Sequence, residues 1–278
     1  MSPDGSTSRP PALSELRFLF QPVQPLGGGG AWAEALVRWY LPDGTVRGPL
    51  DVLPHWLAPS NVASFTRYTL DQAASALAGA PTSQVSVNLS PAQVMLPDTM
   101  RVLNDLVPAV RGRLRIEITE QRLRDRRPIA ASLPSLRSRC AAIMLDDVTP
   151  DDLPSWTDLE TLFGSGLDGV KIDRSVTWQL FDTDTAAREL AREFVMSARR
   201  RFDIVVAEGV EDPSICHALA DLGVTHVQGF GVGRPRRALD GTTLDRRVGF
   251  HAPAPPPAPA PVDAQTPDPV EGNACDGA

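Results

Sequence analysis

The chain has 278 residues, 42% of them hydrophobic, and a formal net charge of −7 at pH 7. This length fits one barrel of ordinary size or two smaller domains. The negative charge argues against a surface for nucleic acid polymers. Because no run approaches the roughly 18 apolar residues of a spanning helix and the first residues do not resemble a signal peptide, we expect a cytoplasmic protein without membrane contact. Three widely separated cysteines predict neither a disulfide framework nor a zinc site.

The predicted elements begin after a disordered segment, residues 1–14, which is rich in Ser and Pro and has no periodicity. Strands over 16–26 and 31–39 flank four glycines, a pattern typical of a hairpin. A phosphate-binding role for the glycines is the weaker interpretation, because no helix follows them and no Lys-Ser/Thr completes the motif.

From residue 65 onward, helix and strand patterns alternate. Helices are expected over 65–77, 128–137, 186–200 and 213–222, and strands over 84–89, 113–119, 141–145, 169–172, 204–207 and 225–227. This alternation predicts an α/β fold, a modified TIM-type (β/α)8 barrel in which the opening hairpin leaves one antiparallel strand near the N-terminus. We expect one barrel domain over 15–250, followed by a disordered Pro/Ala-rich tail over 251–278.

Acidic or amide residues stand where the predicted strands end. They are Glu34, Asn88, Glu117, Asp146, Asp147, Asp173 and Glu208, with Glu211 close behind. From Asn88 to Asp173 the steps are 29, 29 and 27 residues, which suits one strand, loop and helix. In a barrel these groups would share one mouth, where so many carboxylates require cations, and hard oxygen ligands select Mg²⁺, Mn²⁺ or Ca²⁺ over zinc.

A pair of metals is the simplest way to neutralise the predicted cluster. Two metals roughly 4 Å apart would activate a bridging water for in-line displacement at phosphorus. The adjacent Asp146 and Asp147 suit the bridging place. Lys171 and Asp173 lie two apart and should point to the same side, where the lysine could orient a water or a phosphate oxygen. A structural ion pair is the alternative for that lysine.

The order and spacing of these short motifs resemble those of the EAL family of cyclic di-GMP phosphodiesterases. The resemblance extends over about residues 18–235 and rests on Phe20-Gln21-Pro22-Val23, Glu34-Ala35-Leu36-Val37-Arg38-Trp39, Val87-Asn88-Leu89-Ser90, Glu117-Ile118-Thr119-Glu120, Asp146-Asp147, Val170-Lys171-Ile172-Asp173-Arg174-Ser175, Ala207-Glu208-Gly209-Val210-Glu211 and Val227-Gln228-Gly229-Phe230. It implies a β/α barrel that hydrolyses cyclic di-GMP to linear pGpG with two divalent cations, Mg²⁺ or Mn²⁺.

The resemblance also implies roles for individual residues. Glu34, Asn88, Glu117, Asp146 and Asp147 would bind the metals, and Asp173 belongs to the same acidic cluster. Glu208 would be a metal ligand or the general base, and Lys171 would hold the attacking water. The substrate would be bound by Leu36 and Arg38 of the Glu-Ala-Leu segment and by Glu211 and Gln228.

One segment departs from the family pattern. Where the family has Phe-Gly-Thr-Gly after the two aspartates, residues 148–154 read Val-Thr-Pro-Asp-Asp-Leu-Pro, without either glycine and with two prolines. Two hypotheses therefore remain. The first is an active phosphodiesterase, and the second is a catalytically impaired cyclic di-GMP receptor or protein-interaction module. A homodimer through the barrel and a regulatory protein partner are further expectations from the family.

Overall fold

The computed structural model describes residues 9–119, 127–151, 156–157 and 166–239. The strands are β1 (Leu16–Pro25), β2 (Trp32–Tyr40), β3 (Val46–Arg47), β4 (Val85–Leu89), β5 (Leu114–Ile118), β6 (Ala142–Val148), β7 (Gly169–Ile172), β8 (Ile204–Ala207) and β9 (His226–Gln228). The helices are η1 (Leu13–Glu15), α1 (Pro49–Trp56), α2 (Val62–Gly79), α3 (Pro91–Met95), α4 (Pro97–Asp105), α5 (Pro108–Arg111), α6 (Arg127–Arg137), α8 (Arg174–Gln179), α9 (Thr185–Arg199), η3 (Pro213–Ile215) and α10 (Cys216–Asp221).

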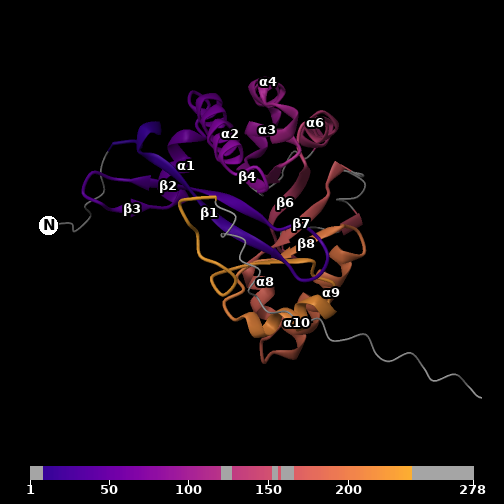
Figure 1. Ribbon diagram of the computed structural model, residues 1–278. Coiled ribbons are helices and arrows are strands. Elements are labelled where there is room, and N and C mark those ends of the chain that lie inside the picture. The colour runs from indigo at the N-terminus through magenta and orange to yellow at the C-terminus, as the bar shows by residue number, and fades with distance from the viewer. Residues whose placement is uncertain (1–8, 120–126, 152–155, 158–165, 240–278) are drawn as a thin grey trace, which may run out of the picture.

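Eight of these strands close a barrel, which confirms the fold expected from the sequence. The order is β1-β9-β8-β7-β6-β5-β4-β2, closed by pairing of β1 with β2, and β3 extends the sheet outside the barrel. From β2 through β9 the barrel strands are parallel, whereas β1 is antiparallel to both neighbours. Helices α2, α3, α4 and α6 cover one side of the strands, and α8, α9 and α10 cover another (Figure 1). The carboxyl ends of the parallel strands therefore meet at one mouth.

Side chains alternate between the helix layer and the barrel interior, as the period of two in a strand requires. In β5, for example, Ile116 and Ile118 belong to the large core beneath the helices, while Glu117 between them is buried with the interior groups. A second, smaller apolar core contains Val23, Trp32, Met144 and Val206, with Ile204 packed against it. On β2 and β6, and directly after β8, an acidic residue stands two positions after a member of this small core, so the apolar layer supports the charged one.

The sequence pattern finds the barrel strands better than the helices. The hairpin is present, with Leu19 opposite Leu36 and Gln21 opposite Glu34. Helix α1 contains Pro54, and α3, α4 and α5 are each nine residues or shorter, so none gives a long helical period. The helix expected over 213–222 is present as the 3-10 turn η3 followed by α10, and the Asp212 side chain caps it by accepting the Ser214 N–H.

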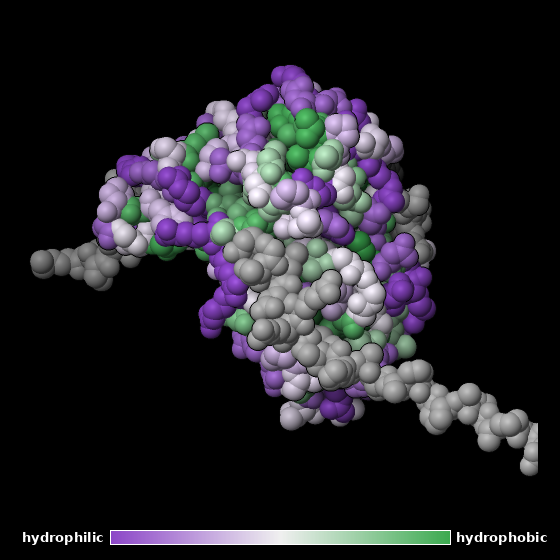
Figure 2. Space-filling view, viewed as in Figure 1, coloured by the Kyte–Doolittle hydropathy of each residue, from purple (hydrophilic) through white to green (hydrophobic). Residues whose placement is uncertain are grey.

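The surface view shows how the outer helices meet solvent. On the face drawn in Figure 2, hydrophobic residues gather over α3 and α4 and hydrophilic residues surround them. Met95 at the end of α3 is 43% exposed and Val107 after α4 is 60% exposed. Within the described residues, no helix has both the length and the apolar character that a membrane span requires. The boundary expected after residue 14 falls within η1, whereas the boundary expected after residue 250 lies outside the described residues; both domain limits stay predictions.

Candidate active site

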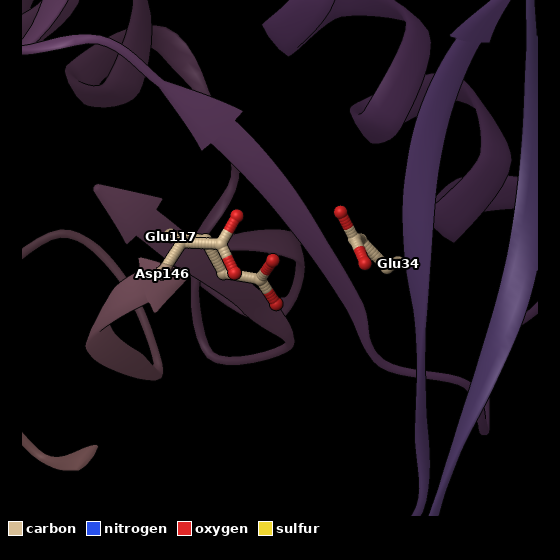
Figure 3. A group of neighbouring side chains, drawn as sticks. All are labelled: Glu34, Glu117 and Asp146. Carbon is tan, nitrogen blue, oxygen red and sulfur yellow. The ribbon is translucent and has the colours of Figure 1, made fainter. Parts of the chain in front are cut away.

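Carboxylates from several strands converge at the mouth of the barrel. Glu34 on β2, Glu117 on β5 and Asp146 on β6 point toward one another (Figure 3), and one oxygen from each lies within 4.8 Å of the others. A second group of the same kind contains Asp146, Asp147 and Glu208. Asp146 belongs to both groups. Two cations bound at these groups would share the Asp146 carboxylate.

A distortion of β6 explains how two consecutive aspartates reach the same place. On a regular strand, adjacent side chains point to opposite faces. Here the pairing of β6 with β7 shifts register between Leu145 and Val148, and Asp147 has φ 53°, in the left-handed region. Aspartate tolerates this region better than most residues with a side chain. The β-bulge therefore keeps Asp146 buried in the barrel while the exposed Asp147 joins the same group.

Lys171 lies at the centre of the carboxylates. Its ammonium is 1% exposed, and Nζ is 2.5 Å from Glu208 Oε1, 2.7 Å from Asp146 Oδ1, 3.1 Å from Glu117 Oε2 and 3.2 Å from Glu34 Oε2. The structural ion pair considered for this lysine is therefore present, and it involves four carboxylates, three on strands β2, β5 and β6 and the fourth, Glu208, directly after β8. The same four carboxylates are members of the two groups that could hold a metal ion.

Two neutral amides hold Glu34 in place. Asn88 Nδ2 donates to Glu34 Oε1 at 2.5 Å, and Gln228 Nε2 donates to Glu34 Oε2 at 2.7 Å. The amide of Gln228 also lies 3.4 Å from Gln21 Oε1 on β1. The amide nitrogen of Asn88 is thus used by Glu34, whereas its oxygen, Oδ1, is a buried acceptor without a hydrogen-bond donor among the described residues. An unpartnered acceptor beside Glu34 is the kind of group that a hard cation would satisfy.

Burial and mutual repulsion change the acidity of the cluster. Burial raises the pKa of Glu117 to about 8 and that of Asp146 to about 6, and it raises the pKa of Glu208 well above its ordinary value. For Glu34, burial acts in the same direction, but the charge of Lys171 and the hydrogen bonds from Gln228 and Asn88 outweigh it and lower the pKa. The cluster therefore contains more carboxylates than the one Lys171 ammonium can neutralise, and bound protons or cations must supply the remaining positive charge.

The carboxylates open into a cavity of about 660 Å³. The four residues predicted to bind substrate, Leu36, Arg38, Glu211 and Gln228, all line it. Burial lowers the pKa of Arg38, which stays cationic, and its Nη1 donates to the carbonyl of Val37. The remaining donors of this half-buried guanidinium can bind an anion. A cavity of this volume suits a ligand of nucleotide size.

Asp173 is the predicted site residue that the structure does not bring into the cluster. Strand β7 ends at Ile172, so the alternation that would place Asp173 beside Lys171 stops before it. Asp173 instead caps helix α8: its Oδ1 accepts the N–H and the hydroxyl of Ser175. It is absent from the cavity wall, which makes a capping role the better-supported one.

The cavity also contains residues for which the sequence pattern assigns no role. Trp178 and Phe230 are large rings at the cavity, 48% and 55% exposed. The Arg174 guanidinium lies 5.4 Å from the Trp178 ring centroid, and that of Arg234 lies 4.7 Å from the Phe230 centroid. On another side, α1 contributes Leu50 and Leu53. Phe230 stands directly after the Gln228-Gly229 motif, but Trp178 could be found only with knowledge of α8.

Part of the divergent segment is described. Val148 is a buried end residue of β6 that pairs with Ile172, and its carbonyl accepts the Asp173 N–H at 3.1 Å. The strand thus continues through the position where the family has the aromatic residue of Phe-Gly-Thr-Gly. Residues 152–154 of the divergent segment, and Glu120, lie outside the described residues.

Comparisons with known proteins agree with this geometry. A family model described as EAL domain matches residues 7–235. A relative from Caulobacter vibrioides, described as an uncharacterized signaling protein, is 29% identical and matches 81% of this chain and 28% of its own length. The cyclic di-GMP phosphodiesterase NbdA of Pseudomonas aeruginosa is 27% identical over 80% of this chain and 29% of its own. The chain therefore spans about three tenths of these curated relatives.

A solved structure extends the comparison to three dimensions. The phosphodiesterase PaMucR in complex with c-di-GMP superimposes with a TM-score of 0.69 at 25% identity, covering 81% of this chain and 93% of that one. The fold around the carboxylates is thus shared with a protein that binds this cyclic dinucleotide.

Proposed function

Because the chain belongs to the EAL domain family, we propose that it is a metal-dependent phosphodiesterase that hydrolyses cyclic di-GMP to linear pGpG. The observation that carries the proposal is the pair of carboxylate groups sharing Asp146 at the mouth of a cavity of about 660 Å³. Relatives named for cyclic di-GMP hydrolysis or bound to this dinucleotide support the choice of substrate.

The residues fit two divalent cations. The donors are oxygens, as Mg²⁺ and Mn²⁺ prefer, and the buried Asn88 Oδ1 has no hydrogen-bond partner in the described part of the chain. Glu34, Asn88, Glu117 and Asp146 would hold one cation, and Asp146, Asp147 and Glu208 the other. Bound there, the cations would activate a water and stabilise charge on the phosphate. Asp173 is the least supported of the predicted ligands, because its carboxylate caps α8.

The remaining polar groups suit the handling of a phosphodiester. Among the described residues, the Val37 carbonyl is the hydrogen-bond acceptor of the Arg38 guanidinium, and the other donors of that group can bind a phosphate oxygen. Glu208, whose Oε1 lies 2.5 Å from Lys171 Nζ, would accept a proton from the attacking water at its carboxylate, and the Lys171 ammonium would orient that water. Gln228 fixes Glu34 and also lines the cavity, so it links the position of a ligand to that of the carboxylates.

A receptor or interaction module without turnover is the second candidate. One observation favours it: β6 continues through the buried Val148, whereas the family has a glycine-containing loop after the aspartates. A stiffer connection would hinder rearrangement around the aspartate pair during turnover. This candidate keeps the cavity and the binding of cyclic di-GMP and loses only hydrolysis.

Hydrolysis and binding assays on the same preparation separate the two candidates. We expect the full chain to form pGpG from cyclic di-GMP with Mg²⁺ or Mn²⁺ and not with EDTA, and Glu34→Ala to abolish product. Calorimetric binding without product in either metal would select the receptor, and a variant carrying Phe-Gly-Thr-Gly after Asp147 would then be expected to gain turnover. Absence of both binding and product would contradict both candidates.

The location, oligomeric state and partners of the protein are less closely defined than its proposed activity. A homodimer through the barrel remains an expectation from the family resemblance, and a cytoplasmic location and a regulatory partner remain expectations from the sequence. Because the chain covers less than a third of the curated relatives it matches, the activity of a longer protein containing it is likewise a proposal.

A further inference from the structure

Lys171 stands apart from every other basic residue in the chain. Of the 27 lysine and arginine residues in the sequence, it is the only lysine. Everywhere else, on the surface and in partly buried ion pairs, the chain has arginine, such as Arg137 beside Asp168. The single exception lies where four carboxylates surround one cation. A compact ammonium with three donors fits such a centre, whereas the planar fork of a guanidinium suits one or two carboxylates.

The position of Nζ is that of a counter-ion for the whole cluster. It contacts Asp146, which belongs to both proposed cation groups. It also contacts Glu34 and Glu117 of the first group and Glu208 of the second. All four contacts are between 2.5 and 3.2 Å, so one ammonium bridges carboxylates that would otherwise face one another. In the described part of the chain, each of the four carboxylates has this ammonium as an ion-pair partner.

We propose that Lys171 is a built-in counter-cation that keeps the four carboxylates assembled when no metal is bound, so that divalent cations bind against its charge. The inference rests on the proposed metal site but concerns stability and metal affinity, not hydrolysis. A lysine that serves only to orient the attacking water would have no effect on the metal-free fold. By contrast, loss of a counter-cation leaves buried carboxylates facing one another, which is strongly destabilising.

The test compares the full-length chain with its Lys171→Met variant, which keeps the length of the side chain and removes the charge. Thermal unfolding is followed in EDTA and in saturating Mg²⁺, and Mn²⁺ affinity is measured by calorimetry. In EDTA we expect the variant to melt about 10 °C below the wild type, and Mg²⁺ to restore most of that difference. Mn²⁺ should bind the variant at least roughly tenfold more tightly, because a like charge has been removed.

Arg113→Met is the matched control. Arg113 directly precedes β5, at the opposite end of that strand from Glu117, and its guanidinium donates to the backbone carbonyls of Leu77, Ala80, Ser83 and Ala109. Its loss should lower the melting temperature equally in EDTA and in Mg²⁺. A Lys171→Met protein that melts like the wild type in EDTA, or binds Mn²⁺ no more tightly, would overturn the proposal.

A second variant covers the case in which Lys171→Met does not fold in either buffer. Lys171→Met combined with Glu117→Gln removes one negative charge together with the positive one. If the double variant folds in EDTA, charge balance is the cause and the proposal stands; if it remains unfolded, the proposal fails. The outcome is separable from the proposed function. Loss of metal-free stability without any hydrolysis by the wild type would refute only the phosphodiesterase, and hydrolysis with unchanged stability would refute only the counter-cation.

Discussion

Burial of His226 in the barrel interior should make the stability of the protein depend on pH, by an amount that can be calculated. This histidine lies on β9 two positions before Gln228, and its ring centroid is 4.6 Å from that of Trp32. Nδ1 is 2.9 Å from Thr225 Oγ1, and the backbone of Gly30 also lies within hydrogen-bonding reach of the ring. Burial and then the positive charge of Arg115 lower the pKa of His226 to about 4. The folded protein therefore strongly prefers the neutral ring.

The sign and size of the effect follow from the two states of the ring. In the unfolded chain the pKa is about 6.5, so the unfolded state binds the proton more readily than the folded state does. Stability is unaffected by His226 above pH 6.5, decreases as the pH falls from 6.5 to about 4, and is level below that. The full loss is about 3 kcal/mol, and at pH 5 it is about 2 kcal/mol.

Urea unfolding of the wild type and His226→Gln at pH 7 and pH 5 measures this effect. The carboxylates of the site titrate in both proteins, so the difference between the two pH-dependent losses isolates the histidine. We expect the wild type to lose about 2 kcal/mol more than the variant. His217→Gln, at a side chain that is 68% exposed on α10, serves as control and should retain the wild-type profile. Equal losses in the wild type and His226→Gln would refute the reasoning.

Three further substitutions test the packing and roles of individual residues. Gly229→Ala would place a Cβ 2.2 Å from the Val210 carbonyl oxygen and so displace Glu208 and Gln228. We expect the free energy of unfolding in urea to fall by about 1–3 kcal/mol and metal binding to weaken. Unchanged values of both would contradict the close approach. Asp173→Ala should cost about 1 kcal/mol through loss of the α8 cap and leave Mn²⁺ affinity unchanged, whereas a large fall in affinity would restore Asp173 as a ligand. Trp178→Ala should raise KM for cyclic di-GMP about fivefold or more with little change in kcat if the ring stacks on a base, and an unchanged KM would exclude stacking.

Much of the barrel and the site could be predicted because both depend on short-range patterns. Interior residues repeat every second position, so an acid at the end of an apolar strand, such as Glu117, is directed to the mouth by its own strand. The same rule fails for Asp173. Strand β7 ends one residue before it, at Ile172, because the Asp173 side chain caps helix α8, and the strand pattern alone does not reveal that cap. Trp178 is missed for a related reason, since the six residues of α8 carry too short a helical period.

The electrostatic arrangement required the three-dimensional structure. Two-residue spacing predicts that Lys171 points inward, but it cannot show that Glu34, 137 positions away in sequence, shares its ammonium with Asp146. The turn at Asp147 was likewise only partly accessible: the adjacent acids indicate a shared site, while the left-handed φ of 53° that allows it depends on the register of β6 against β7.

The most direct test of the central claim is the origin of the oxygen in the product. The full chain is incubated with cyclic di-GMP and Mn²⁺ in ¹⁸O-labelled water, and the product is weighed by mass spectrometry. Hydrolysis by an activated water predicts linear pGpG that carries one ¹⁸O on its terminal phosphate, with none formed by Glu34→Ala. Unaltered cyclic di-GMP after exhaustive incubation, or product without the label, would contradict the assignment of this site as a hydrolytic centre.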